Sequence, residues 1–179
     1  IGNGTTLAPA VANLDLAAAS SRTAFMSASA DGKKVATCNS SSAPFVYLFS
    51  YDPDTKRAVP MGVGGLPAVG CVCLNWSPCG NYLAHHPSAT STVKLFKHEN
   101  GSFVEVHSEV ASGACRGAWS RDGEWYFVAT GNPFLLKNNR NGTFTKFALT
   151  NGITGWVEGV PIWSPDGRHV FLEMNSAPY

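Results

Sequence analysis

The chain has 179 residues, of which 44% are hydrophobic and 14% charged, and its formal net charge is +1. A chain of this length can bury a sizeable core, and its weak net charge argues against a nucleic acid or an anionic membrane as partner. The charge-free run from Ala58 to Val93 is broken by prolines, so it does not predict insertion in a membrane.

Residues 1–21 are expected to form a connecting segment or an outer strand. A first four-stranded unit is expected over 22–62, where Ala28-Ser29-Ala30-Asp31-Gly32 supplies turn residues between apolar runs. Its third strand is expected at Phe45-Val46-Tyr47-Leu48-Phe49.

A second unit is expected over 68–108. It holds Trp76-Ser77-Pro78-Cys79-Gly80 between two apolar strands, and Asn100-Gly101 between the next two. Asn-Gly predicts a hairpin with a type I′ turn, because that turn needs positive φ at both central residues.

A third unit, 112–150, repeats this order with Trp119-Ser120-Arg121-Asp122-Gly123 and a hairpin at Asn141-Gly142. An incomplete fourth, 155–179, carries Trp163-Ser164-Pro165-Asp166-Gly167 and stops where its third strand should begin. By itself the chain is therefore not expected to close a ring.

The repeat length predicts the architecture. The four turn glycines, Gly32, Gly80, Gly123 and Gly167, are 48, 43 and 44 residues apart, which is the period of a four-stranded propeller blade. The expected fold is an all-β partial β-propeller of about three complete blades plus partial blades at both ends. Equivalent, mostly buried positions are expected for Trp76, Trp119 and Trp163, and a structural turn role for Asp31, Asp122 and Asp166.

The same segments resemble a known superfamily. Trp-Ser-Pro-Asp-Gly before an apolar pair, and later Thr92-Val93-Lys94-Leu95-Phe96, are similar to the WD40 repeat. Its Gly-His dipeptide is missing, however, and Lys97 or Ser50 stands where the Asp of Trp-Asp belongs.

Repeat arrays on structural proteins of tailed bacteriophages are more similar. Ser40-Ser41-Ser42-Ala43-Pro44-Phe45 and Gly142-Thr143-Phe144-Thr145-Lys146 resemble segments of those arrays, and the resemblance covers residues from about 22 to 179.

Cysteine usage predicts neither a metal site nor a cofactor. On a regular strand Cys71 and Cys73 share one face and can fill a core, and no second spaced pair completes a zinc site. The five cysteines, an odd number, are expected to be reduced structural thiols, which favours folding in the cytosol.

No catalytic residue is predicted, because no nucleophile elbow, P-loop, dinucleotide fingerprint or zinc-protease motif occurs. The binding candidates are Trp125 and Trp156, which have no counterparts in other repeats, and the pair His85 and His86. Local packing is the alternative for the tryptophans, and a turn or inter-blade hydrogen bond for the histidines.

We therefore expect a non-catalytic structural or binding segment of a larger assembly, a virion tail protein assembled in the host cytoplasm. Its partners would be other protein subunits, and a host-surface protein or glycan. The alternative is the propeller portion of a bacterial enzyme or of a periplasmic or extracellular protein, lactonase-like or peptidase-associated, in the bacterial cytoplasm or at the cell surface.

Overall fold

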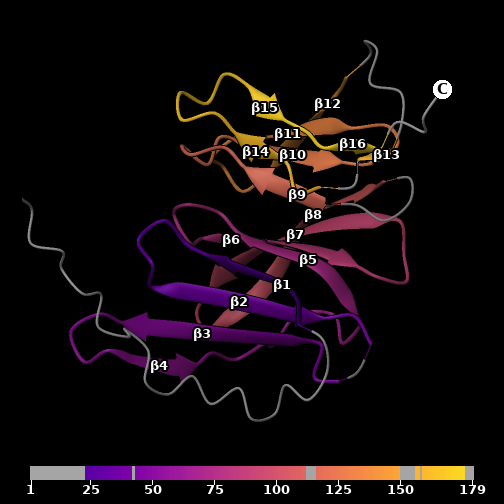
Figure 1. Ribbon diagram of the computed structural model, residues 1–179. Helices are drawn as coiled ribbons and strands as arrows, with labels where there is room; N and C mark the ends of the chain where they lie inside the picture. Colours follow the sequence, from indigo (N-terminus) through magenta and orange to yellow (C-terminus); the bar gives the residue numbers. More distant parts are fainter. Residues whose placement is uncertain (1–22, 42, 112–115, 150–155, 158, 176–179) are drawn as a thin grey trace, which may run out of the picture.

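The computed structural model describes residues 23–41, 43–111, 116–149, 156–157 and 159–175. Over these ranges the chain is all-β, and they contain no helix long and apolar enough to cross a membrane. Three four-stranded antiparallel sheets and two short strand pairs lie on one another in chain order (Figure 1). The predicted partial β-propeller is confirmed.

Each complete sheet is a meander whose strands pair in sequence order. Blade 1 consists of β1 (Thr23–Ala28), β2 (Lys34–Asn39), β3 (Val46–Asp52) and β4 (Arg57–Pro60). Blade 2 consists of β5 (Cys71–Trp76), β6 (Tyr82–Pro87), β7 (Thr92–Glu99) and β8 (Ser102–Val110). Blade 3 consists of β9 (Arg116–Trp119), β10 (Trp125–Ala129), β11 (Phe134–Asn138) and β12 (Phe144–Ala148).

The last repeat is a split hairpin, which we call blade 4. Its strands are β13 (Trp156–Val157), β14 (Ile162–Trp163), β15 (Val170–Phe171) and β16 (Met174–Asn175). β14 pairs with β15, and β13 pairs with β16. These are the first two strands of the repeat, each interrupted once.

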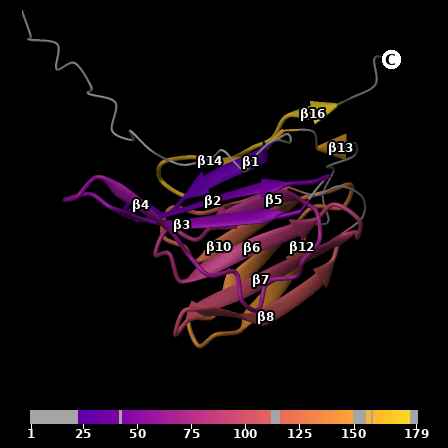
Figure 2. The ribbon, with the colours of Figure 1, turned by 90° about the horizontal axis from the view of Figure 1, so that it is seen from below.

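The blades fan about their first strands. β5 contacts β1 on one side and β9 on the other, and β9 contacts β14. In Figure 2, β1 and β14 lie on one side of the array and β8 on the opposite side. The first strands therefore form the inner edge of the array, where a propeller has its channel.

The core lies between the sheets, because each blade has two faces to bury. One cluster joins blades 1 and 2 through residues such as Leu48, Leu74 and Phe96. A second joins blades 2 and 3, and a third joins Phe127 and Ala129 of blade 3 to the last hairpin.

The repeated tryptophans tie each blade to the one before it. Trp76 and Trp119 are buried and Trp163 is half-buried. Trp119 Nε1 donates to the carbonyl of Asn75 at 3.2 Å, and Trp163 Nε1 donates to the carbonyl of Ala118 at 3.0 Å. In both cases the acceptor immediately precedes the tryptophan of the earlier blade, which confirms the predicted equivalence for Trp119 and Trp163. Trp76 Nε1 makes no such bond with the described residues.

The four repeat turns share one local geometry. Their glycines have φ between 68° and 69°, the left-handed region that glycine tolerates. The serine hydroxyl donates to the aspartate two residues later at 2.6 Å in Ser29–Asp31 and Ser120–Asp122, and at 2.5 Å in Ser164–Asp166. The turn role predicted for the three aspartates is confirmed.

Blade 2 carries Cys79 in place of this aspartate, with its sulfur 3.4 Å from the Ser77 hydroxyl. We expect Cys79→Asp to raise the free energy of unfolding by about 0.5–1 kcal/mol, because it restores a hydrogen bond to a carboxylate. Asp122→Cys is the reverse control and should lower it. Urea denaturation measures both, and a loss of stability in Cys79→Asp would contradict the expectation.

The turn aspartates also predict an acid response. The pKa values of Asp31, Asp122 and Asp166 lie below the usual 3.8. The largest cause is the hydrogen bond from the serine hydroxyl, and the second is the hydrogen bond from the backbone N–H two residues after the aspartate. A carboxyl group whose pKa is lower in the folded state than in the unfolded chain stabilises the fold at pH values above the unfolded-state pKa. This stabilisation is lost as the pH falls through the folded-state pKa.

Asp122→Asn should therefore weaken the loss of stability between about pH 5 and pH 2, measured by urea unfolding at each pH. Asp54→Asn, at an exposed position of the β3–β4 turn, is the control. An unchanged acid profile in Asp122→Asn would count against this role.

Both Asn-Gly hairpins form between antiparallel strands, as predicted. Asn100 (φ 52°) and Gly101 (φ 77°) make the expected type I′ pair. At Asn141-Gly142 the predicted type I′ turn is wrong. The positive φ values belong to Arg140 and Gly142, and Asn139 N donates to Thr143 O. Asn141 Oδ1 instead accepts from Thr143 N at 3.0 Å, which stabilises a three-residue loop.

Candidate functional site

The inner edge of the array carries almost no charge. Within the described part of the first strands, Arg116 is the single Asp, Glu, Lys or Arg residue, and it is exposed at the start of β9. A guanidinium in that place can bind a carboxylate or a phosphate through two parallel hydrogen bonds.

A buried polar network crosses the interface between blades 2 and 3. His86 Nε2 lies 2.6 Å from the Tyr126 hydroxyl, and Asn75 Nδ2 donates to this hydroxyl at 3.1 Å and to Gly117 O at 2.8 Å. His86 and Tyr126 have no exposed surface. The network therefore holds the two blades in register and does not contact solvent in this conformation.

A second polar cluster lies between blades 1 and 2, around Cys38, Cys71 and His85, all of them buried. Neither ring nitrogen of His85 makes a hydrogen bond of regular geometry with the described residues. The Cys71 thiol lies beside this ring and interacts with it. The predicted histidine pair is thus divided between two blade interfaces.

Strand register explains this division and corrects the expectation for the cysteines. Cys71 pairs with Pro87 and Cys73 pairs with His86, so Val72 is an inserted bulge residue. Since Pro87 and His86 are neighbours and point to opposite faces, the two thiols also point apart. The expected shared face is wrong.

The tryptophan candidates differ in how far the structure describes them. Trp125 on β10 is half-buried, and the centre of its ring lies 5.5 Å from that of Phe147 and 5.4 Å from the Lys137 ammonium, both in its own blade. Trp156 belongs to β13, whose backbone pairs with β16, and its side chain lies outside the described part. A binding role for Trp125, Trp156, His85 or His86 stays a prediction.

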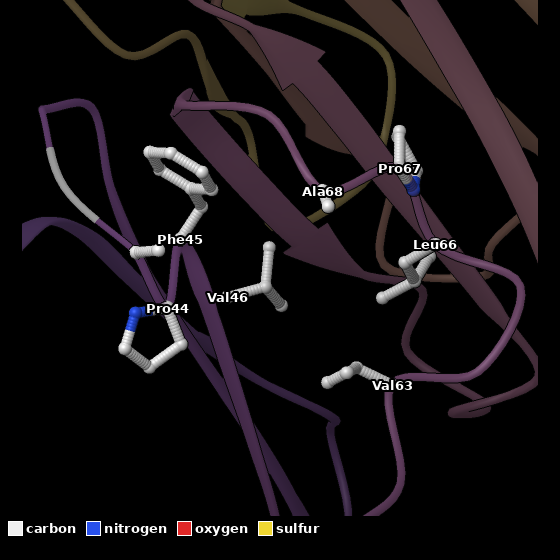
Figure 3. Close-up of a pocket in the computed structure, with 8 residues that line it drawn as sticks. Pro44, Phe45, Val46, Val63, Leu66, Pro67 and Ala68 are labelled. Carbon is white, nitrogen blue, oxygen red and sulfur yellow. The ribbon is translucent and has the colours of Figure 1, made fainter.

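An apolar pocket of about 280 Å³ lies between the β2–β3 turn and the segment that leads to blade 2. Figure 3 shows Val46, Val63 and Leu66 pointing into it from the two walls. Its other lining residues are Ala43, Pro44, Phe45, Pro67 and Ala68. None of the described residues that line the pocket has a side chain that could move a proton, so their surface suits an apolar group.

Sequence reasoning did not identify this pocket. The signal available was the charge-free run from Ala58 to Val93, of which 61–70 belongs to no strand. For a metal, the described residues offer no group of three or more His, Cys, Asp or Glu side chains arranged to hold an ion.

No protein-family model matches the chain, and no curated protein is similar to it in sequence. Solved structures, however, share its fold. A candidate 6-phosphogluconolactonase from Bacteroides uniformis matches with a TM-score of 0.62 and 20% identity over 81% of this chain and 45% of its own. The periplasmic gluconolactonase of Pseudomonas aeruginosa matches with a TM-score of 0.59 and 15% identity over 84% of this chain and 50% of its own.

The β-propeller domain of Cps50 (Swd1) from Myceliophthora thermophila matches with a TM-score of 0.60 and 13% identity, over 87% of this chain and 49% of its own. The chain thus spans about half the length of each of these structures. At this identity the likeness shows the fold, a β-propeller.

These structures correct one expectation and leave another without support. The prediction that the chain is not an enzyme is wrong, because gluconolactonases are among the propellers that it resembles. A propeller can gather catalytic side chains from several blades, so it needs no short contiguous motif. None of the three structures is a virion protein, and the tail-protein reading gains nothing from them.

Proposed function

We propose that the chain is the propeller portion of a lactonase-like enzyme that acts on a sugar lactone. The observation that carries this proposal is the shared half-propeller in two proteins named as lactonases, one of them a candidate 6-phosphogluconolactonase. The likeness of fold supports the proposal.

In this proposal the blades position the substrate at the inner edge. A lactone with a phosphate or carboxylate group is an anion, and Arg116 is the exposed cation on the described part of the first strands. Hydrolysis adds water to the lactone carbonyl and breaks the ring C–O bond, which needs a group that takes up a proton. His85 and His86 are closed off from solvent and do not supply it in this conformation.

The test is hydrolysis of 6-phosphogluconolactone and of uncharged gluconolactone, followed by pH-stat and corrected for the spontaneous rate with heat-denatured protein. The 179-residue chain and the native protein as isolated from its source are both assayed. Rates no higher than the spontaneous rate in both preparations would contradict the proposal.

Arg116→Ala tests the substrate class. It should raise KM for the phosphorylated lactone by about tenfold, with little change for the uncharged one, because only the former offers an anion. Arg121→Ala, which removes an exposed arginine from the β9–β10 turn, is the matched control. Equal effects of the two variants would exclude Arg116 from substrate binding.

A further inference from the structure

We propose that Cys38 and Cys71 are an oxidation-sensitive pair that closes to a disulfide between blades 1 and 2. Cys38 lies on β2 and Cys71 begins β5, and both belong to the buried cluster that joins these blades. β2 and β5 contact each other at this interface, and the two thiols are close enough to shift each other's pKa.

The backbone holds the two cysteines together. Gly70, directly before Cys71, packs against the carbonyl of Ser40, two residues after Cys38. A Cβ atom at Gly70 would lie 3.1 Å from the Ser40 carbonyl carbon and 2.6 Å from Ser88 Oγ. Glycine therefore permits an approach of the two blades that a side chain would prevent.

The two thiols differ in acidity, as a nucleophile and its partner do. Burial raises the pKa of Cys71, but the interactions with Cys38 and His85 outweigh it and bring the pKa below its usual value. The hydrogen bond to Cys71 and burial raise the pKa of Cys38. Cys71 is thus the sulfur expected to react first, since the thiolate is the nucleophile.

Cys73 is not expected to take part. Its sulfur accepts from Asn75 Nδ2 at 3.0 Å, and Asn75 in turn contacts Gly117 and Tyr126 of blade 3. The bulge at Val72 turns this thiol toward blade 3, while Cys71 faces blade 1.

With hydrogen peroxide as oxidant the atoms balance in two steps. The Cys71 sulfur attacks one peroxide oxygen, the O–O bond breaks, and the leaving oxygen takes up the thiol proton and departs as water. The Cys38 sulfur then attacks the sulfenic sulfur of Cys71, the S–S bond forms, and the S–O oxygen leaves as water with the Cys38 proton. Two thiols are oxidised to one disulfide, and one peroxide is reduced to two waters.

The experiment uses the full chain with Cys79→Ser and Cys115→Ser, so that only Cys38, Cys71 and Cys73 remain. The folded protein is treated with hydrogen peroxide, and non-reducing mass spectrometry with fragmentation locates the bond. We expect the loss of two hydrogens per chain and a Cys38–Cys71 link. The melting temperature should rise by roughly 5–15 °C, because the bond closes a long loop.

Single variants in this background distinguish the partners. Cys73→Ser should leave the link intact, whereas Cys38→Ser should leave Cys71 as a sulfenic acid that dimedone traps. A link through Cys73, or no intrachain link after oxidation of protein whose circular dichroism is native, would overturn the proposal.

Discussion

We expect Trp119→Ala to lower the free energy of unfolding by about 3–5 kcal/mol, the usual cost of removing a large buried aromatic side chain. The Trp119 ring is 9% exposed and lies 4.8 Å from Tyr126 and 6.1 Å from Phe144. Its Nε1 donates across the blade interface to Asn75 O at 3.2 Å. The substitution removes this bond and leaves a cavity between blades 2 and 3, and urea denaturation measures the loss.

Trp125→Ala is the matched control, since this side chain is only half-buried and its ring packs within its own blade. Its cost should stay near 1 kcal/mol, because it opens no closed cavity. Similar losses in the two variants would mean that the interface between blades does not govern the stability of the chain.

Gly117→Ala should cost about 1–3 kcal/mol by overpacking. A Cβ atom on Gly117 would collide with the Tyr126 hydroxyl, would lie 2.5 Å from Tyr126 Cζ and would lie 2.7 Å from the Phe127 carbonyl oxygen. One of these contacts is backbone, and the Tyr126 ring is held by His86 and Asn75, so neither can move freely. The added methyl group should therefore also break the buried network.

Gly62→Ala is the control for this substitution, because the nearest atom to its Cβ is Gly101 O at 3.7 Å. It should change stability by less than about 0.5 kcal/mol. The measurements are urea denaturation and the near-ultraviolet circular dichroism of the aromatic side chains. A neutral Gly117→Ala would show that β9 can shift away from β10.

The repeat made most of the fold predictable. Turn chemistry is local: Ser120, Asp122 and Gly123 satisfy one another within four residues, so the sequence is enough to recognise the turn. The hairpin at Asn100-Gly101 was predictable for the same reason. The Asn141 loop was not fully predictable, because Thr143 N donates a hydrogen bond to the Asn141 side chain, and this bond competes with the two-residue turn.

The candidate site was far less predictable, because its residues meet across blades. His85 and His86 are adjacent in sequence but belong to different interfaces, and the partner of His86 is Tyr126, 40 residues away. The apolar pocket likewise joins a turn of blade 1 to the segment before blade 2. No local pattern contains these pairs.

The sequence by itself determined the blade period, the turn positions and the burial of Trp76 and Trp119, since each depends on residues close together in the chain. Only the tertiary structure decided which polar groups pair. The bulge at Val72 turns Cys71 toward Cys38 and Cys73 toward blade 3, and strand register reverses a side chain's face for every residue inserted. The contacts between blades depend on that register. A bulge residue can be recognised only when the pairing of both strands is known.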